Sequence, residues 1–144
     1  MTEQAHMARH PDLIELRERY DAASASPVSE VAAGLALLAA VFLAASPWIV
    51  GFTALTAITV TNLIAGSALA VLVIVLTGAY GRMHGLTFVV PAIGIWTIAA
   101  PWVIAGAMDV TRTIYANCFA GGAIVVLGLI MLAVGFLRVR RPAL

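Results

Sequence analysis

Four long apolar segments follow one polar segment along the chain. Apolar residues dominate residues 31–51, 57–79, 86–106 and 114–137, and none of these segments holds a charge in its interior. A helix needs about 20 mainly apolar residues to cross the hydrocarbon core of a bilayer. A transmembrane β-strand would instead alternate in polarity over about ten residues. The pattern therefore predicts an all-α membrane protein with four transmembrane helices.

The polar N-terminal segment is expected to form a separate head. It holds six of the seven acidic residues within the first thirty positions. Pro11 suits the first turn of a helix. Leu13, Leu16 and Tyr20 would then share one face of that helix. We therefore expect a short amphipathic helix over about residues 11–22. It lacks the Lys/Arg-rich polar face of interfacial helices, so docking on the span ends or on a partner protein is favoured over docking on lipid.

Composition supports membrane insertion and argues against nucleic-acid binding. Hydrophobic residues make up 62% of the chain and charged residues 10%, whereas soluble domains average about 45–50% and about 25%. The net charge is +1 and there is no lysine, so no basic surface for nucleic acid is expected. Placing both termini in the cytoplasm leaves Arg112 as the one arginine outside. That topology is predicted because cytoplasmic flanks carry the excess of arginine.

Two stretches of the chain match each other at an offset of 54 or 55 residues. The matched residues are Ser46 with Ala100, Pro47 with Pro101, Trp48 with Trp102, Asn62 with Asn117 and Gly66 with Gly121. Each unit would contain two spans, so we expect two helical hairpin repeats of the same orientation, related by an approximate two-fold axis along the membrane normal. The expected boundaries are a head at 1–29, hairpins at 30–82 and 83–138, and a tail at 139–144.

At these residues the sequence resembles the SPW-repeat family of small membrane proteins, named for the Ser-Pro-Trp that stands here as Ser46-Pro47-Trp48. The resemblance covers about residues 29–137, and residues 16–21 and 79–85 look like actinobacterial members. The resemblance implies this fold in a bacterial cell membrane. It does not imply a particular catalytic activity, substrate or cofactor. The second copy departs from the family pattern at Ala100, so both halves cannot share a role for the serine hydroxyl.

The matched prolines, tryptophans and asparagines have structural roles that follow from their chemistry. Proline removes a backbone donor and bends a helix, and tryptophan prefers the headgroup level. Asn62 and Asn117 would lie one to two turns into the returning helices. There an amide could bond the carbonyls freed by the prolines or reach across the two-fold axis. The alternative is a substrate site between the two asparagines.

Three glycines at every seventh position, Gly121, Gly128 and Gly135, would line one stripe of the fourth span. Such a stripe lets another backbone approach closely, either within the chain or in a second protein. In the second outer turn Asp109 and Arg112 are spaced to form an ion pair across a helical turn. A solvated pair of this kind contributes little stability.

No cofactor or metal is expected. Cys118 is the only cysteine, which excludes a Cys-x-x-Cys motif, and no histidine lies within a span to ligate haem. Catalytic side chains for an enzyme are also missing. We therefore expect a non-catalytic accessory or scaffold subunit that binds the bilayer and another membrane protein or itself. The alternative is an oligomeric transporter or channel for a small solute that uses Asn62 and Asn117. A dry interior beside them would favour the scaffold.

Overall fold

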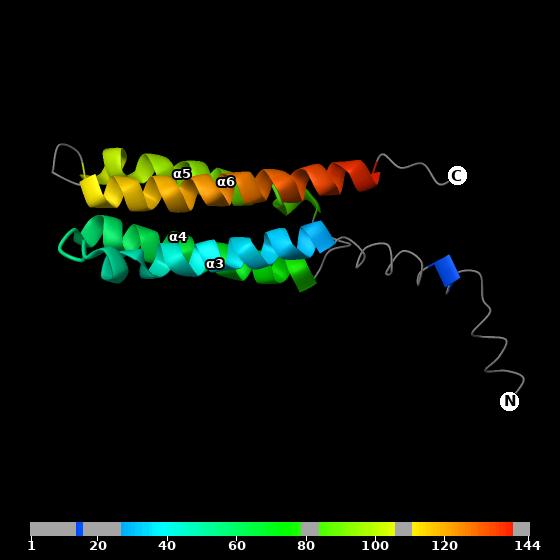
Figure 1. Cartoon of the computed structure of the whole chain (residues 1–144), viewed down its shortest axis with the longest axis horizontal. Helices are drawn as coiled ribbons and strands as arrows, with labels where there is room; N and C mark the ends of the chain where they lie inside the picture. The colour runs from blue at the N-terminus through cyan, green and yellow to red at the C-terminus, as the bar shows by residue number, and fades with distance from the viewer. Residues whose placement is uncertain (1–13, 16–26, 79–83, 106–110, 140–144) are drawn as a thin grey trace, which may run out of the picture.

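The protein is a bundle of apolar helices, seen here in a computed structural model that describes residues 14–15, 27–78, 84–105 and 111–139 (Figure 1). The elements are α3 (Pro27–Val50), α4 (Thr56–Gly78), the 3₁₀ turn η1 (His84–Leu86), α5 (Val89–Ala105) and α6 (Thr111–Val139). No strand occurs within those ranges. The expectation of an all-helical protein is thereby confirmed for the described residues.

The helices pack in a closed square. α3 contacts α4 and α6, and α5 also contacts α4 and α6. In Figure 1 α3 and α4 form one side-by-side pair and α5 and α6 the other. This order leaves α4 diagonal to α6. On α3 the inward side is a line of fully or nearly buried alanines, Ala32, Ala33, Ala36 and Ala40, which lets the neighbouring helices approach closely.

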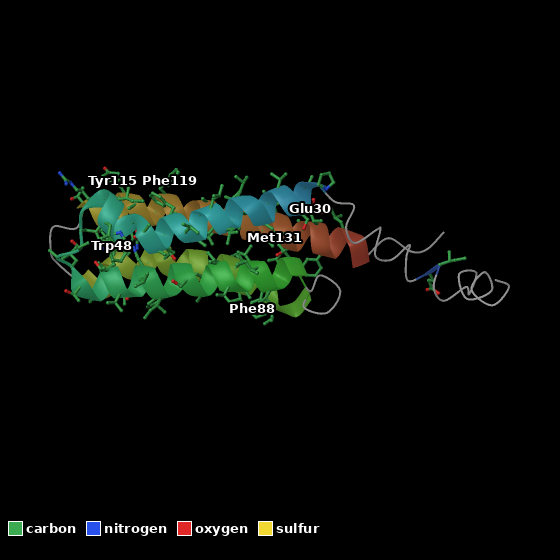
Figure 2. All side chains as sticks on the ribbon, turned by 90° about the horizontal axis from the view of Figure 1, so that it is seen from below. Glu30, Trp48, Phe88, Tyr115, Phe119 and Met131 are labelled. Atoms are coloured by element: carbon green, nitrogen blue, oxygen red, sulfur yellow. The ribbon has the colours of Figure 1, made fainter. Side chains whose placement is uncertain are left out.

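Large apolar side chains cover the outside of the bundle. Leu38, Val103 and Phe136 are exposed by 66%, 65% and 68%, and hydrocarbon side chains project around the helices in Figure 2. α3, α4 and residues Thr111–Leu137 of α6 are each long and apolar enough to cross a membrane. α5 is a shorter apolar helix of 17 residues. At about 1.5 Å per residue it is about 25 Å long.

The third helix differs from the span expected at residues 86–106. Its first residue is Val89, whereas Leu86 is the last residue of η1 and a turn of two residues separates the two elements. The reason lies in Pro91, which has no N–H and therefore fits an unkinked helix only in the first turn. The expected start was three residues too early because the hydrophobicity of a segment does not show that Pro91 lacks a backbone N–H.

The ends of α3 show how proline and glycine set helix boundaries. Pro27 occupies the first helical position, four residues before the expected start at 31, and proline is favoured there. Gly51 follows the last residue with a φ of +82°. The backbone N–H groups of Gly51 and Phe52 both donate to the carbonyl of Pro47, at 3.1 and 3.0 Å. Glycine closes the helix here because it adopts a positive φ without strain.

Several predictions about the head and loops fall on parts of the chain that the structure does not describe. Of the expected head helix over 11–22, only Ile14 and Glu15 are described, and both are helical. Apart from Arg112, the arginine side chains that predict the topology lie outside the described set. The orientation in the membrane therefore stays a prediction.

Several glycines allow neighbouring helices of the chain to pack closely. A Cβ added to Gly66 would lie 2.6 Å from the Ala40 carbonyl oxygen, and one added to Gly121 would lie 2.7 Å from that of Gly94. At Gly128 it would lie 2.6 Å from Cδ of Pro91. Gly121 and Gly128 of the glycine stripe thus face α5 of the same chain, while Gly135 is half-buried.

We predict that Gly121→Ala destabilises the bundle by about 1–3 kcal/mol, because the new methyl group overpacks a backbone contact. The neighbouring Gly122 has nothing within 4 Å of an added Cβ. Gly122→Ala is the matched control and should be neutral or stabilising by up to about 1 kcal/mol, since alanine favours helix. Thermal unfolding of the two purified variants in the same detergent measures the difference. Equal melting temperatures would contradict the close contact.

Candidate functional site

The centre of the bundle holds a pair of asparagines that bond each other. Asn62 Nδ2 donates to Asn117 Oδ1 at 2.8 Å, and Asn117 Nδ2 donates back to Asn62 Oδ1 at 3.2 Å. Their exposed fractions are 1% and 0%. Because α4 and α6 lie diagonally, this reciprocal pair joins the two hairpins across the middle of the bundle.

The two interior prolines leave two carbonyls without a helical donor, and the asparagine network reaches both, directly or through Ser46. A helical carbonyl normally accepts from the N–H four residues later. Pro47 and Pro101 have no N–H, so the carbonyls of Leu43 and Thr97 lose their helical donors. Such carbonyls need a replacement partner within hydrocarbon, where water is absent.

In the first hairpin a serine relays the bond. Ser46 Oγ donates to the Leu43 carbonyl at 2.8 Å, and Asn62 Nδ2 donates to Ser46 Oγ at 3.2 Å. Ser46 is fully buried. The hydroxyl thus bridges the amide of α4 and the freed carbonyl of α3.

In the second hairpin alanine stands where the first has serine, and the bond is direct. Asn117 Nδ2 donates to the Thr97 carbonyl at 3.1 Å. Thr97 is the residue 54 positions after Leu43, and Ala100 is 54 positions after Ser46. The missing hydroxyl is therefore compensated by the amide itself. Both alternatives raised by the sequence occur together at Asn117, whose amide bonds the freed Thr97 carbonyl and also reaches Asn62. Asn62 reaches Asn117 and is linked to the Leu43 carbonyl through Ser46.

The network uses every donor that the two amides possess. A carboxamide nitrogen has two N–H groups. Those of Asn62 go to Ser46 and Asn117, and those of Asn117 go to Asn62 and Thr97. No amide donor remains for a bound solute. The chemistry of this centre is therefore that of a structural crosslink.

The other matched residues surround this network in different ways. Gly66 and Gly121 follow the asparagines by one helical turn and bring α4 onto α3 and α6 onto α5. Trp48 and Trp102 are 59% and 53% exposed and lie outside the network. In Figure 2 Trp48 lies at the same end of the bundle as Tyr115, where α3 ends and α6 begins.

Of the expected outer ion pair between Asp109 and Arg112, the structure describes one residue. Arg112 is exposed in the first turn of α6, whereas Asp109 lies in the undescribed interval before it. The pairing of these two residues stays a prediction. Among the described residues no three His, Cys, Asp or Glu side chains gather as metal ligands, and Cys118 is half-buried on α6.

Sequence reasoning overlooked Thr113, one turn before Asn117 on α6. It is 1% exposed, and its hydroxyl has no hydrogen-bond partner among the residues that the structure describes. The matched residue 55 positions earlier is Ile58, which is equally buried. The four-residue spacing from Asn117 was the available signal for its burial.

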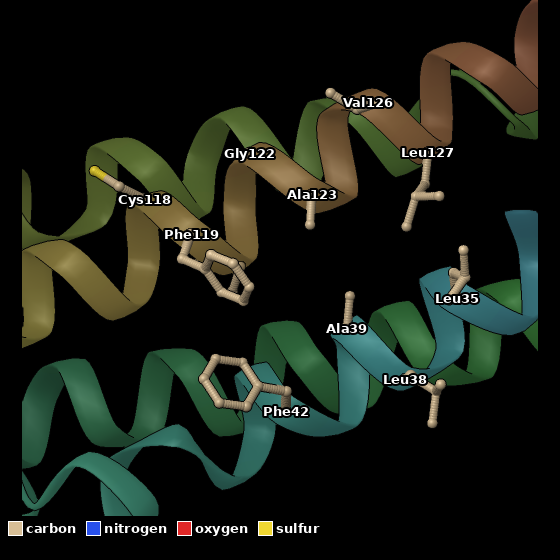
Figure 3. Close-up of a pocket in the computed structure, with 11 residues that line it drawn as sticks. Leu35, Leu38, Ala39, Phe42, Cys118, Phe119, Gly122, Ala123, Val126 and Leu127 are labelled. Atoms are coloured by element: carbon tan, nitrogen blue, oxygen red, sulfur yellow. The ribbon is translucent and has the colours of Figure 1, made fainter.

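An apolar groove runs along the outside between α3 and α6 (Figure 3). Its volume is about 770 Å³. Phe42 and Phe119 meet across it edge to face, with ring centres 6.1 Å apart and planes at 82°. Ala39 and Ala123 project toward the space between the two helices. No polar residue marks this groove in the sequence, because it forms only when two distant helices are placed together.

The chain belongs to the SPW repeat domain family, whose model matches residues 30–131. It is accordingly a helical membrane protein of that family. No curated protein and no solved structure matches the chain.

We predict strong coupling between the two asparagines. Asn62→Leu alone leaves the buried amide of Asn117 without its partner, so it should lower the free energy of unfolding by about 1–3 kcal/mol. Changing both residues to leucine should cost less than the sum of the single changes by about 1 kcal/mol or more. A double-mutant cycle of unfolding in detergent measures this. Additive single effects would show that the amides do not act as a pair.

Thr113 gives a prediction of the opposite sign. A buried hydroxyl without a partner costs about 1–3 kcal/mol, and valine has a similar shape without the polar atom. Thr113→Val should therefore raise the unfolding free energy by about 1 kcal/mol or more. Thr97→Val is the matched comparison and should not stabilise, since its hydroxyl already donates to the Ile93 carbonyl at 2.8 Å. Destabilisation by Thr113→Val would reveal a partner for its hydroxyl.

Proposed function

We propose that this protein is a non-catalytic scaffold of the bacterial cell membrane, an accessory subunit that binds another membrane protein. The observation that carries the proposal is the closed amide network, in which Asn62 and Asn117 use all their N–H donors within the chain. The most polar part of the interior is thereby committed to holding the bundle together. We therefore place the function of the protein on the surface of the bundle.

The proposal includes the duplicated architecture, with two hairpins of the same orientation and both termini in the cytoplasm. Matching contacts support the duplication. An added Cβ on Gly66 would meet Ala40 and Ala44, and one on Gly121 would meet Gly94 and Ile98. Residues 94 and 98 lie 54 positions after residues 40 and 44. Equivalent positions thus make equivalent contacts in the two hairpins.

A transporter or channel is the alternative function, and the geometry favours the scaffold over it. A site for a small polar solute needs donors and acceptors that the solute can reach. Asn62 and Asn117 are 1% and 0% exposed, and their donors are occupied. Freeing these donors for a solute would require breaking bonds within the network, such as the bond from Asn117 to the freed Thr97 carbonyl.

The groove between α3 and α6 supplies a surface for the partner. Its small lining residues, Ala39, Gly122 and Ala123, permit the close approach of a transmembrane helix. Small residues at helix interfaces favour association in lipid, where apolar character alone gives no driving force. We place the partner's helix there, between the two hairpins.

The test is purification in native nanodiscs from the source membrane, followed by mass spectrometry of the intact complex. Wild-type protein should carry a defined second protein. Ala123→Trp fills the groove and should lose that protein. Ala92→Trp, at an exposed position of α5, is the matched control and should retain it. Recovery of only monomers or homodimers from wild type would contradict the scaffold proposal.

A further inference from the structure

We draw no further inference here: the strongest candidate, the buried hydroxyl of Thr113 in the first turn of α6, has no hydrogen-bond partner among the described residues, and nothing in the structure shows a ligand that would reach it.

Discussion

The arrangement of this bundle depends on finding donors for two backbone carbonyls that proline leaves without a partner. Within hydrocarbon no water can bond the carbonyls of Leu43 and Thr97, so the protein must do so itself. Asn117 donates to the Thr97 carbonyl, and Ser46, which accepts from Asn62, donates to the Leu43 carbonyl. The two asparagines also bond each other. Gly66 and Gly121 allow the close helix approach that places the amides within reach. Proline, asparagine and glycine thus act as one unit in each hairpin.

Because of this constraint, the inside of the bundle holds bonded polar groups and the outside is apolar. The interior polar groups are occupied by one another, with Thr113 as an enclosed exception. The exterior consists of apolar side chains, and Ser67 on α4 interrupts them with a hydroxyl at mid-span. A membrane protein built this way has its unused binding capacity on its lipid-facing surface. Association with other membrane helices is the activity that we propose for this surface.

Much of the fold could be predicted from the sequence, because the length of an apolar segment indicates a span and the chemistry of proline limits where a helix begins. The first and last residues of α4 and α6 lie within three residues of the predicted spans. The roles open to Asn62 and Asn117 followed from their position beside the prolines. The groove and the exposure of Ser67 could not be predicted, because nearly uniform hydrophobicity does not tell which side of a span faces its neighbours. In lipid both sides are apolar.

The central claim is that side chains replace the donors removed by proline, Asn117 directly and Asn62 through the Ser46 hydroxyl. Solid-state NMR of the protein in lipid bilayers tests it through the side-chain nitrogens. The account predicts a short-range correlation between Asn117 Nδ2 and the Thr97 carbonyl carbon, and slow exchange of the amide protons of both asparagines with deuterated water. Rapid exchange of those protons, or a Thr97 carbonyl without an Asn117 correlation, would contradict the account.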